Sequence, residues 1–267
     1  MSTKTVSVRR VNKVFNQGRE NHVDALVDVD LDVEDGTFVS LIGPSGCGKS
    51  TLLRLMADLT QPTSGEILIN AKSSKQARLD QDYGMAFQAA GLFEWRKVAK
   101  NIELPLELRG WDRAKRQARS KEMLELVKLP EFGEHYPWEL SGGMQQRVAI
   151  ARALAIDPPL LLMDEPFGAL DEMTREHMQT ELTRICLATK KTVVFVTHSI
   201  PEAVFLSDRV VVMSARPGRI TDIIDVGLGE RSEAARESGK FFEKITEVRE
   251  ALRGVEVGMN VRGIEDR

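Results

Sequence analysis

Residues 43–51 constrain the fold of this chain more than any other stretch, because they read GPSGCGKST. The spacing fits Gly-x-x-x-x-Gly-Lys-Ser, a loop whose glycines let backbone N–H groups curl around phosphates. The short apolar run TFVSLIG leads into the loop, and a segment with helical spacing, KSTLLRLMADL, leads out of it. An ordinary strand-to-helix turn is the alternative, but it does not require this spacing. The sequence therefore predicts an α/β fold organised around a phosphate-binding loop.

The loop also predicts a nucleotide site in which individual loop residues have different roles. Lys49 supplies positive charge to the β and γ phosphates, and the Ser50 hydroxyl can ligate Mg²⁺. The predicted nucleotide-binding residues of the loop are Gly43, Pro44, Ser45, Gly46, Cys47, Gly48, Lys49, Ser50 and Thr51.

A second apolar run ends in two acids, since residues 160–166 read LLLMDEP. Asp164, at the carboxyl end of this predicted buried strand, is placed to hold Mg²⁺. Glu165 is aimed differently, toward the position of an attacking water. A strand end that simply meets solvent is the alternative, and the phosphate loop makes it less favourable.

Three further residues are candidates whose roles depend on their neighbours. His198 follows the apolar strand TVVFVT and is predicted to contact the γ-phosphate or the attacking water, although a histidine at a strand end is more often structural. Gln88 ends YGMAFQ and is predicted to touch Mg²⁺ or water, or else to be an ordinary surface residue. Phe15 is predicted to stack on adenine, or else to be a core residue of an early strand.

The remaining chain shows alternating strands and helices. Period-two alternation in TVSVRRV and HVDALVDVDLDV predicts an N-terminal antiparallel sheet, and strands recur in PTSGEILIN, YGMAFQ, PLLLMDEP and KTVVFVTHS. Residues of about 89–158 carry long charged helical stretches, which indicates a helical insertion. DRVVVMSARPGRITDIIDV predicts a hairpin turning at Pro217-Gly218, and an amphipathic helix follows around FFEKITEVREAL.

Composition excludes several classes of protein. A formal net charge of −3 offers no dominant positive field for nucleic acid. The polar start MSTKTVSVRR lacks the apolar region of a secretory signal, and no apolar run reaches the roughly 18 residues of a spanning helix. The two cysteines match no metal-ligand spacing, which fits a reducing cytosol. We therefore expect a soluble chain whose association with a membrane requires a partner.

One further segment decides the family that the chain resembles. Residues 139–148 read ELSGGMQQRV, and Leu140 to Gln145 resemble the signature motif of ATP-binding cassette (ABC) ATPases. The phosphate loop, Gln88, the signature, the acidic strand end, the Ala169-Leu170-Asp171 turn and His198 follow in that family's order. A Ser141 cap with close-packing glycines is the alternative for this segment alone.

The resemblance covers roughly residues 1–227 and implies a head-to-tail dimer that holds two ATP molecules with Mg²⁺. It implies a P-loop NTPase core, a mixed and largely parallel sheet flanked by helices, with an N-terminal antiparallel β-subdomain and an inserted α-helical subdomain. Residues 1–227 are predicted to be the ATPase domain and 228–267 a charged helical tail. The implied roles are Glu165, His198 and Gln88 in catalysis; Ser50, Gln88 and Asp164 on Mg²⁺; Ser141, Gly142, Gly143 and Gln145 on the partner subunit's ATP; and Asp171 in a dimer-interface loop.

The chain also resembles one group within the family, the importers of nitrate, sulfonate, taurine and bicarbonate. FQAAGLFEWRKVAKNIELPLEL and ARPGRI carry this likeness, although Glu94 precedes Trp95 where members usually have proline. The resemblance implies a peripheral subunit on the cytoplasmic face of the cell membrane. Its implied partners are a second ATPase subunit, an integral membrane permease and, indirectly, a solute-binding protein, with no nucleic acid. A soluble ATPase that acts on nucleic acid or a ribosome is the alternative.

Overall fold

Two β-sheets and the helices around them make up the structure, a computed structural model that describes residues 4–168, 170–229 and 231–265. The smaller sheet has the order β2-β1-β4-β5 and is antiparallel, as the period-two alternation predicts. Its strands are β1 (Lys4–Phe15), β2 (Val23–Glu34), β4 (Ser64–Ile69) and β5 (Lys72–Ser73).

The larger sheet has six strands in the order β10-β9-β3-β8-β7-β6. Strands β9, β3, β8, β7 and β6 are parallel, and β10 pairs antiparallel with β9 through the predicted hairpin. The bounds are β3 (Phe38–Ile42), β6 (Tyr83–Ala86), β7 (Leu160–Asp164), β8 (Thr192–Val196), β9 (Arg209–Met213) and β10 (Ile220–Asp225). The predicted fold class, a mixed and largely parallel sheet with an antiparallel subdomain, is confirmed.

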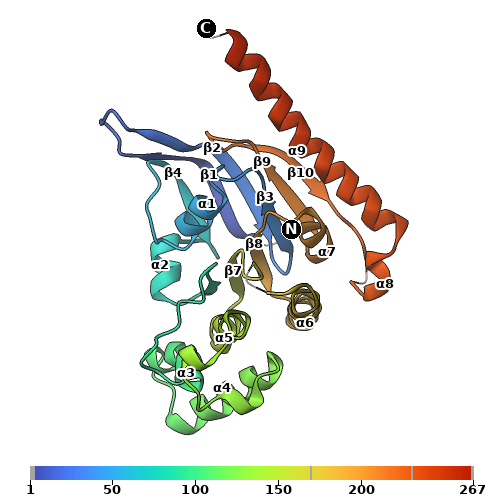
Figure 1. Ribbon diagram of the computed structural model, residues 1–267. Helices are drawn as coiled ribbons and strands as arrows, with labels where there is room; N and C mark the ends of the chain where they lie inside the picture. The colour runs from blue at the N-terminus through green and yellow to red at the C-terminus, as the bar shows by residue number, and fades with distance from the viewer. Residues whose placement is uncertain (1–3, 169, 230, 266–267) are drawn as a thin grey trace.

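Helix α1 (Lys49–Met56) lies between the two sheets (Figure 1). Its buried residues share one apolar core with the inner faces of β1, β2 and β4 and with one face of β3, β7 and β8. The short helix α2 (Ser74–Leu79) follows β5 and buries Ala77 in the same core. The phosphate loop is therefore held between a buried strand and a buried helix.

Helices cover the other face of the larger sheet. Helices α3 (Val98–Leu108), α4 (Arg113–Leu126) and α5 (Gly142–Ala155) form a lobe at one end of the molecule (Figure 1). Two 3₁₀ turns, Pro130–Phe132 and Pro137–Glu139, connect α4 to α5. Helices α6 (Glu172–Thr189) and α7 (Ile200–Leu206) share with this lobe a second apolar core, separate from the one around α1.

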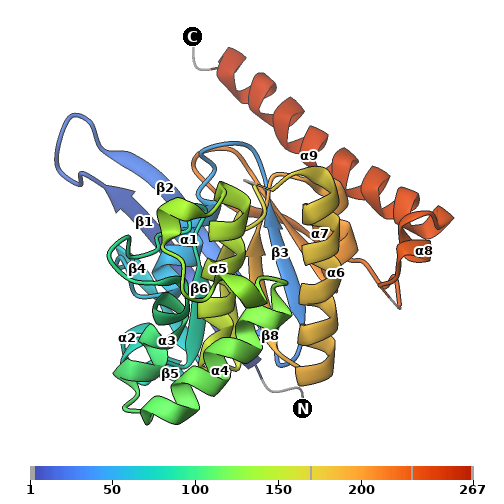
Figure 2. The ribbon, with the colours of Figure 1, turned by 60° about the horizontal axis from the view of Figure 1, so that its bottom comes forward.

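The C-terminal segment adds two helices, α8 (Glu233–Arg236) and α9 (Gly239–Glu265). Phe241, Ile245 and Val248 of α9 are buried in this second core, beside β9, β10 and α7. The far end of α9 projects away from the rest of the molecule (Figure 2). Among the described residues, no helix is both long enough and apolar enough to cross a bilayer.

Candidate functional site

The phosphate loop joins β3 to α1 and forms one wall of a cavity of about 400 Å³. Gly48 has a φ of +102°, a left-handed conformation that glycine adopts without strain, and it caps the start of α1. The Lys49 ammonium donates to the carbonyl oxygens of Gly43 at 2.7 Å and of Pro44 at 3.0 Å. Gly43 and Pro44 therefore shape the loop from outside the cavity. The cavity is lined by Phe15, Val23, Ala25, Ser45, Gly46, Cys47, Gly48, Lys49, Ser50, Thr51, Gln88, Glu165, His198 and Arg216.

Two of the predicted magnesium ligands are in direct contact. The Ser50 hydroxyl donates to Asp164 Oδ1 at 2.7 Å, although the residues are 114 apart in sequence. The contact forms because β3 and β7 are parallel strands of one sheet, separated by β8, and both end at the same edge. A hydroxyl and a carboxylate oxygen beside a phosphate loop fit Mg²⁺, which prefers oxygen ligands.

Glu165 and His198 are also brought together. His198 Nδ1 lies 3.1 Å from Glu165 Oε2, and both side chains line the cavity. The contact joins the carboxyl end of β7 to that of β8, its neighbour in the sheet. A carboxylate held against an imidazole is an arrangement that can orient and deprotonate a water molecule.

Gln88 and Phe15 line the same cavity from different elements. Gln88 follows β6 and is exposed. Phe15 ends β1 with 39% of its surface exposed, and the Lys13 ammonium lies 4.9 Å from its ring centroid. Phe15 is therefore an open aromatic face at the cavity wall rather than a core residue.

The signature residues do not line this cavity. Ser141 is the N-cap of α5, and its hydroxyl accepts a hydrogen bond from the Met144 backbone N–H at 3.3 Å. Gln145 Nε2 donates to the carbonyl oxygens of Pro137 and Leu140, at 2.9 and 3.3 Å. Ser141 and Gly142 are exposed, whereas Gly143 is half-buried. Their contact with a second subunit's nucleotide stays a prediction.

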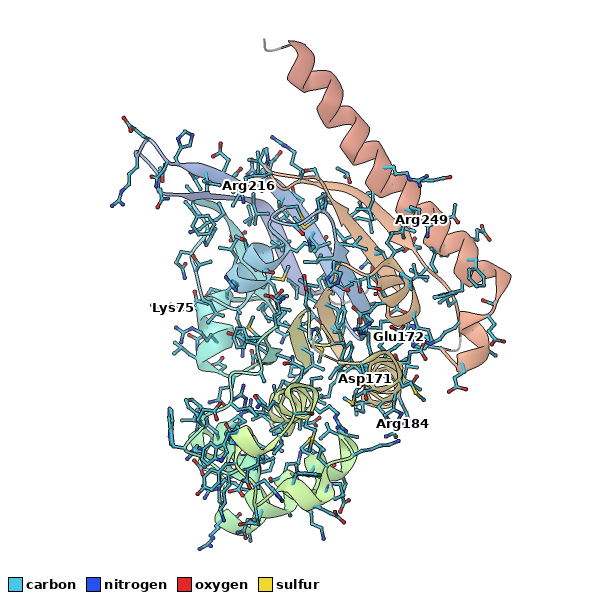
Figure 3. All side chains as sticks on the ribbon, viewed as in Figure 1. Lys75, Asp171, Glu172, Arg184, Arg216 and Arg249 are labelled. Carbon is cyan, nitrogen blue, oxygen red and sulfur yellow. The ribbon has the colours of Figure 1, made fainter. Side chains whose placement is uncertain are left out.

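Asp171 starts α6 as its N-cap and accepts a hydrogen bond from the Thr174 backbone N–H at 3.0 Å. That bond holds the pKa of the Asp171 carboxyl below its usual range. Asp171 lies beside Glu172 at the start of α6 (Figure 3). Ala169, in the predicted turn before it, lies outside the described residues.

Three lining residues were not predicted from the sequence, namely Val23, Ala25 and Arg216. Val23 and Ala25 begin β2, and its alternation pattern does not show that this end of the strand meets the loop. Arg216 follows β9, which is parallel to β3 and therefore ends at the same edge of the sheet. The position of Arg216 shortly after an apolar strand is the sequence signal that could have predicted its place in the cavity lining.

Comparison with known proteins adds independent findings. The family model described as ABC transporter matches residues 26–168. An uncharacterized ABC transporter ATP-binding protein of Methanocaldococcus jannaschii is 48% identical, over 89% of this chain and 87% of its own length. An aliphatic sulfonates import ATP-binding protein of Bacillus cereus is 47% identical, over 83% and 86%. A solved ATP-binding cassette, in a dimeric post-hydrolysis state with ADP and Pi, matches with a TM-score of 0.76 and 36% identity, over 82% and 98%.

Proposed function

Because this chain belongs to the ABC transporter family, we propose that it is the ATP-hydrolysing subunit of an importer, acting through a separate membrane permease. The main support for this proposal is that the phosphate loop, the oxygen pair of Ser50 and Asp164 and the pair of Glu165 and His198 meet at one cavity. This set has the components of assisted phosphoryl transfer to water.

Each side chain has a role in that reaction. Phe15 offers a ring for adenine, the loop N–H groups and Lys49 bind the phosphates, and Glu165 accepts a proton from the attacking water. His198 orients Glu165 through their hydrogen bond. Ser50, Asp164 and Gln88 would hold Mg²⁺, which neutralises charge on the phosphates.

A second copy of this chain is the proposed partner at the cavity mouth. The exposed N-terminus of α5, with Ser141 and Gly142, carries unpaired N–H groups and the positive end of a helix dipole. It lies outside the lining of its own chain's cavity. The cassette that this chain matches is dimeric and holds ADP and Pi, which supports dimer formation. In the proposed dimer, each α5 contacts the nucleotide of the other subunit.

An apolar groove is the proposed docking site for the permease. It has a volume of about 500 Å³ and lies between β6, the segment that follows it and α3. Leu108 at its edge is 71% exposed, and the nearby Trp95 is 74% exposed beside the ring of Phe93. The apolar side chains of the groove include Tyr83, Met85, Phe87, Phe93, Leu104, Pro105 and Leu108. An amphipathic segment on the cytoplasmic side of a permease fits such a surface.

The proposed solute is a taurine-like or aliphatic sulfonate compound, captured by a separate solute-binding protein. The support is the likeness to import proteins named for these solutes, including a taurine import ATP-binding protein of Roseobacter denitrificans that is 44% identical. The proposed location is peripheral, on the cytoplasmic face of the cell membrane.

Co-purification from membranes tests the proposal. Tagged wild-type chain is expected to recover an integral membrane permease, and Leu108→Asp is expected to lose it because a carboxylate would be desolvated in the apolar groove. Leu187→Asp is the matched control, since Leu187 is 58% exposed on α6, away from the groove. Equal recovery of the permease with Leu108→Asp and Leu187→Asp would show that the groove is not the docking site. ATPase stimulation by RNA or DNA, without a permease, would reject the transport function.

A further inference from the structure

Arg216 lies at the tip of the hairpin between β9 and β10, in a turn that its own hydrogen bonds close. The Ser214 backbone N–H donates to Arg219 O at 2.9 Å, and the Ser214 hydroxyl donates to Pro217 O at 3.0 Å. The Arg219 backbone N–H donates to the Ser214 hydroxyl oxygen at 2.9 Å. Arg216 therefore projects from an ordered turn.

This turn is pressed against both the phosphate loop and β2. The Gly218 N–H donates to Ala25 O at 3.0 Å, and the Val27 N–H donates to Gly218 O at 3.0 Å. A Cβ atom at Gly218 would lie 2.0 Å from the carbonyl oxygen of Cys47, so only glycine allows this approach. The position of Arg216 is thus coupled to the two walls of the nucleotide cavity.

The Arg216 side chain reaches over the phosphate loop. Its Nη2 atom lies 3.4 Å from the position that a Cβ would occupy at Gly46, and Arg216 lines the cavity with the loop residues. Figure 3 shows Arg216 beside β2, the strand that the turn contacts through Gly218.

Within the described part of the chain, Arg216 has no hydrogen bond or ion pair. Lys49 differs, because its ammonium already donates to Gly43 O and Pro44 O. The acids that line or border the cavity are engaged as well, Asp164 with Ser50 and Glu165 with His198. Among the described residues, the Arg216 guanidinium therefore has no anionic partner, although it lines a cavity that is proposed to bind phosphate.

We propose that Arg216 binds the phosphate chain of the nucleotide held by its own subunit. A guanidinium presents a planar fork of donors that matches two phosphate oxygens, and this bond is stronger than one between neutral groups. The proposal rests on the proposed function, namely that the cavity holds ATP. It adds a phosphate ligand that comes from outside the loop and the acidic strand end.

Equilibrium binding of Mg-ADP tests the proposal without closing a dimer. Arg216→Gln is expected to raise the dissociation constant about tenfold, the loss of one charge-assisted contact. The dissociation constant of Arg216→Lys is expected to lie between those of Arg216→Gln and wild type. Added salt is expected to reduce the difference in dissociation constant between Arg216→Gln and wild type. Arg219→Gln, in the same turn but outside the cavity lining, is the matched control and is expected to bind as wild type does.

Inorganic pyrophosphate identifies the part of the nucleotide that Arg216 contacts. In competition with a fluorescent ADP, Arg216→Gln is expected to weaken pyrophosphate by about the same factor as ADP. Unchanged pyrophosphate binding with weakened ADP would place the contact on the nucleoside and overturn the proposal. Weakening seen only with Mg-ATP, at concentrations that form dimers, would assign Arg216 to the subunit interface and overturn it too.

Lys49→Ala separates this inference from the proposed function. If Lys49→Ala loses ADP while Arg216→Gln binds it as wild type does, the cavity is the nucleotide site and the role of Arg216 is wrong. If neither variant changes ADP binding, the nucleotide site itself is wrong.

Discussion

Glu165 follows strand β7 with a backbone φ of +45°, in the left-handed region that non-glycine residues seldom adopt. Its N–H donates to Val196 O at 3.0 Å, which ties this backbone to the end of β8. The Glu165 carboxylate contacts His198, whereas the adjacent Asp164 carboxylate contacts Ser50. Two adjacent acids thus have different partners, one on the magnesium side of the site and one on the side of the attacking water.

Glu165→Gln is expected to lower the rate of ATP hydrolysis by about 10²- to 10⁴-fold, because an amide cannot accept the proton of the attacking water. ATP binding is expected to persist, since the shape and polarity of the side chain are kept. Steady-state phosphate release and equilibrium ATP binding measure the two effects. Hydrolysis at the wild-type rate would remove Glu165 from the mechanism.

At the scale of elements, a chain of contacts that is buried at α6 and α7 and half-buried at α8 links these three helices. Glu202, in the first turn of α7, accepts hydrogen bonds from the Thr197 hydroxyl and from Gln179 Nε2 of α6. Arg236 of α8 donates to Gln179 Oε1 at 2.7 Å and lies 3.5 Å from the ring centroid of Phe205. The C-terminal segment therefore supports, through Gln179, the turn that carries His198.

Glu202 makes stability depend on pH. Burial raises the pKa of its carboxyl above the usual 4.5, against the opposing effects of its hydrogen bonds and of Arg175 and His198. The unfolded chain ionises this group at lower pH than the folded chain does. Its contribution to the free energy of unfolding is therefore fully present below about pH 4.5 and falls as pH rises toward the folded-state pKa.

Glu202→Gln removes this titration. The melting temperature of the variant is expected to rise relative to wild type as pH increases from about 5 to 8, because only the wild type then buries a charge. Thermal unfolding across that range measures it, with the exposed Glu243→Gln of α9 as control. A difference that stays constant with pH would mean that Glu202 does not titrate as described.

At the scale of the whole molecule, the nucleotide cavity and the N-terminus of α5 are two separate surfaces of one subunit. The cavity forms where the two sheets meet, whereas the N-terminus of α5 opens to solvent outside it. In a dimer with a twofold axis, the N-terminus of α5 in each subunit would face the cavity of the other subunit.

Ser141→Arg is expected to leave Mg-ATP binding within about twofold of wild type but to abolish ATP-induced dimers, because a long cation would fill the space of the partner's phosphate. Sedimentation in a Glu165→Gln background measures the dimer. Ser73→Arg is the matched control, since Ser73 caps α2 through the same kind of bond at 3.3 Å. Both changes cost about 1 kcal/mol of capping. Dimers formed equally by both variants would reject the predicted role of Ser141.

Local sequence was enough to predict most elements and part of the site. Alternation predicted the antiparallel sheet, and Pro217-Gly218 predicted the hairpin, because strand faces and turns depend on neighbouring residues. The amphipathic pattern around residues 241–252 predicted a helix but not its extension to Glu265. The acids and His198 were predicted together because parallel strands end at one edge.

The identity of the phosphate loop and its acidic partners was thus readable from residue spacing, since glycine flexibility and strand ends act over a few positions. The path from Arg236 to Glu202 and the reach of Arg216 were not readable. Those contacts depend on strand order, on β9 lying beside β3 and on the Gly218 turn meeting Cys47, and no local pattern specifies which distant elements become neighbours.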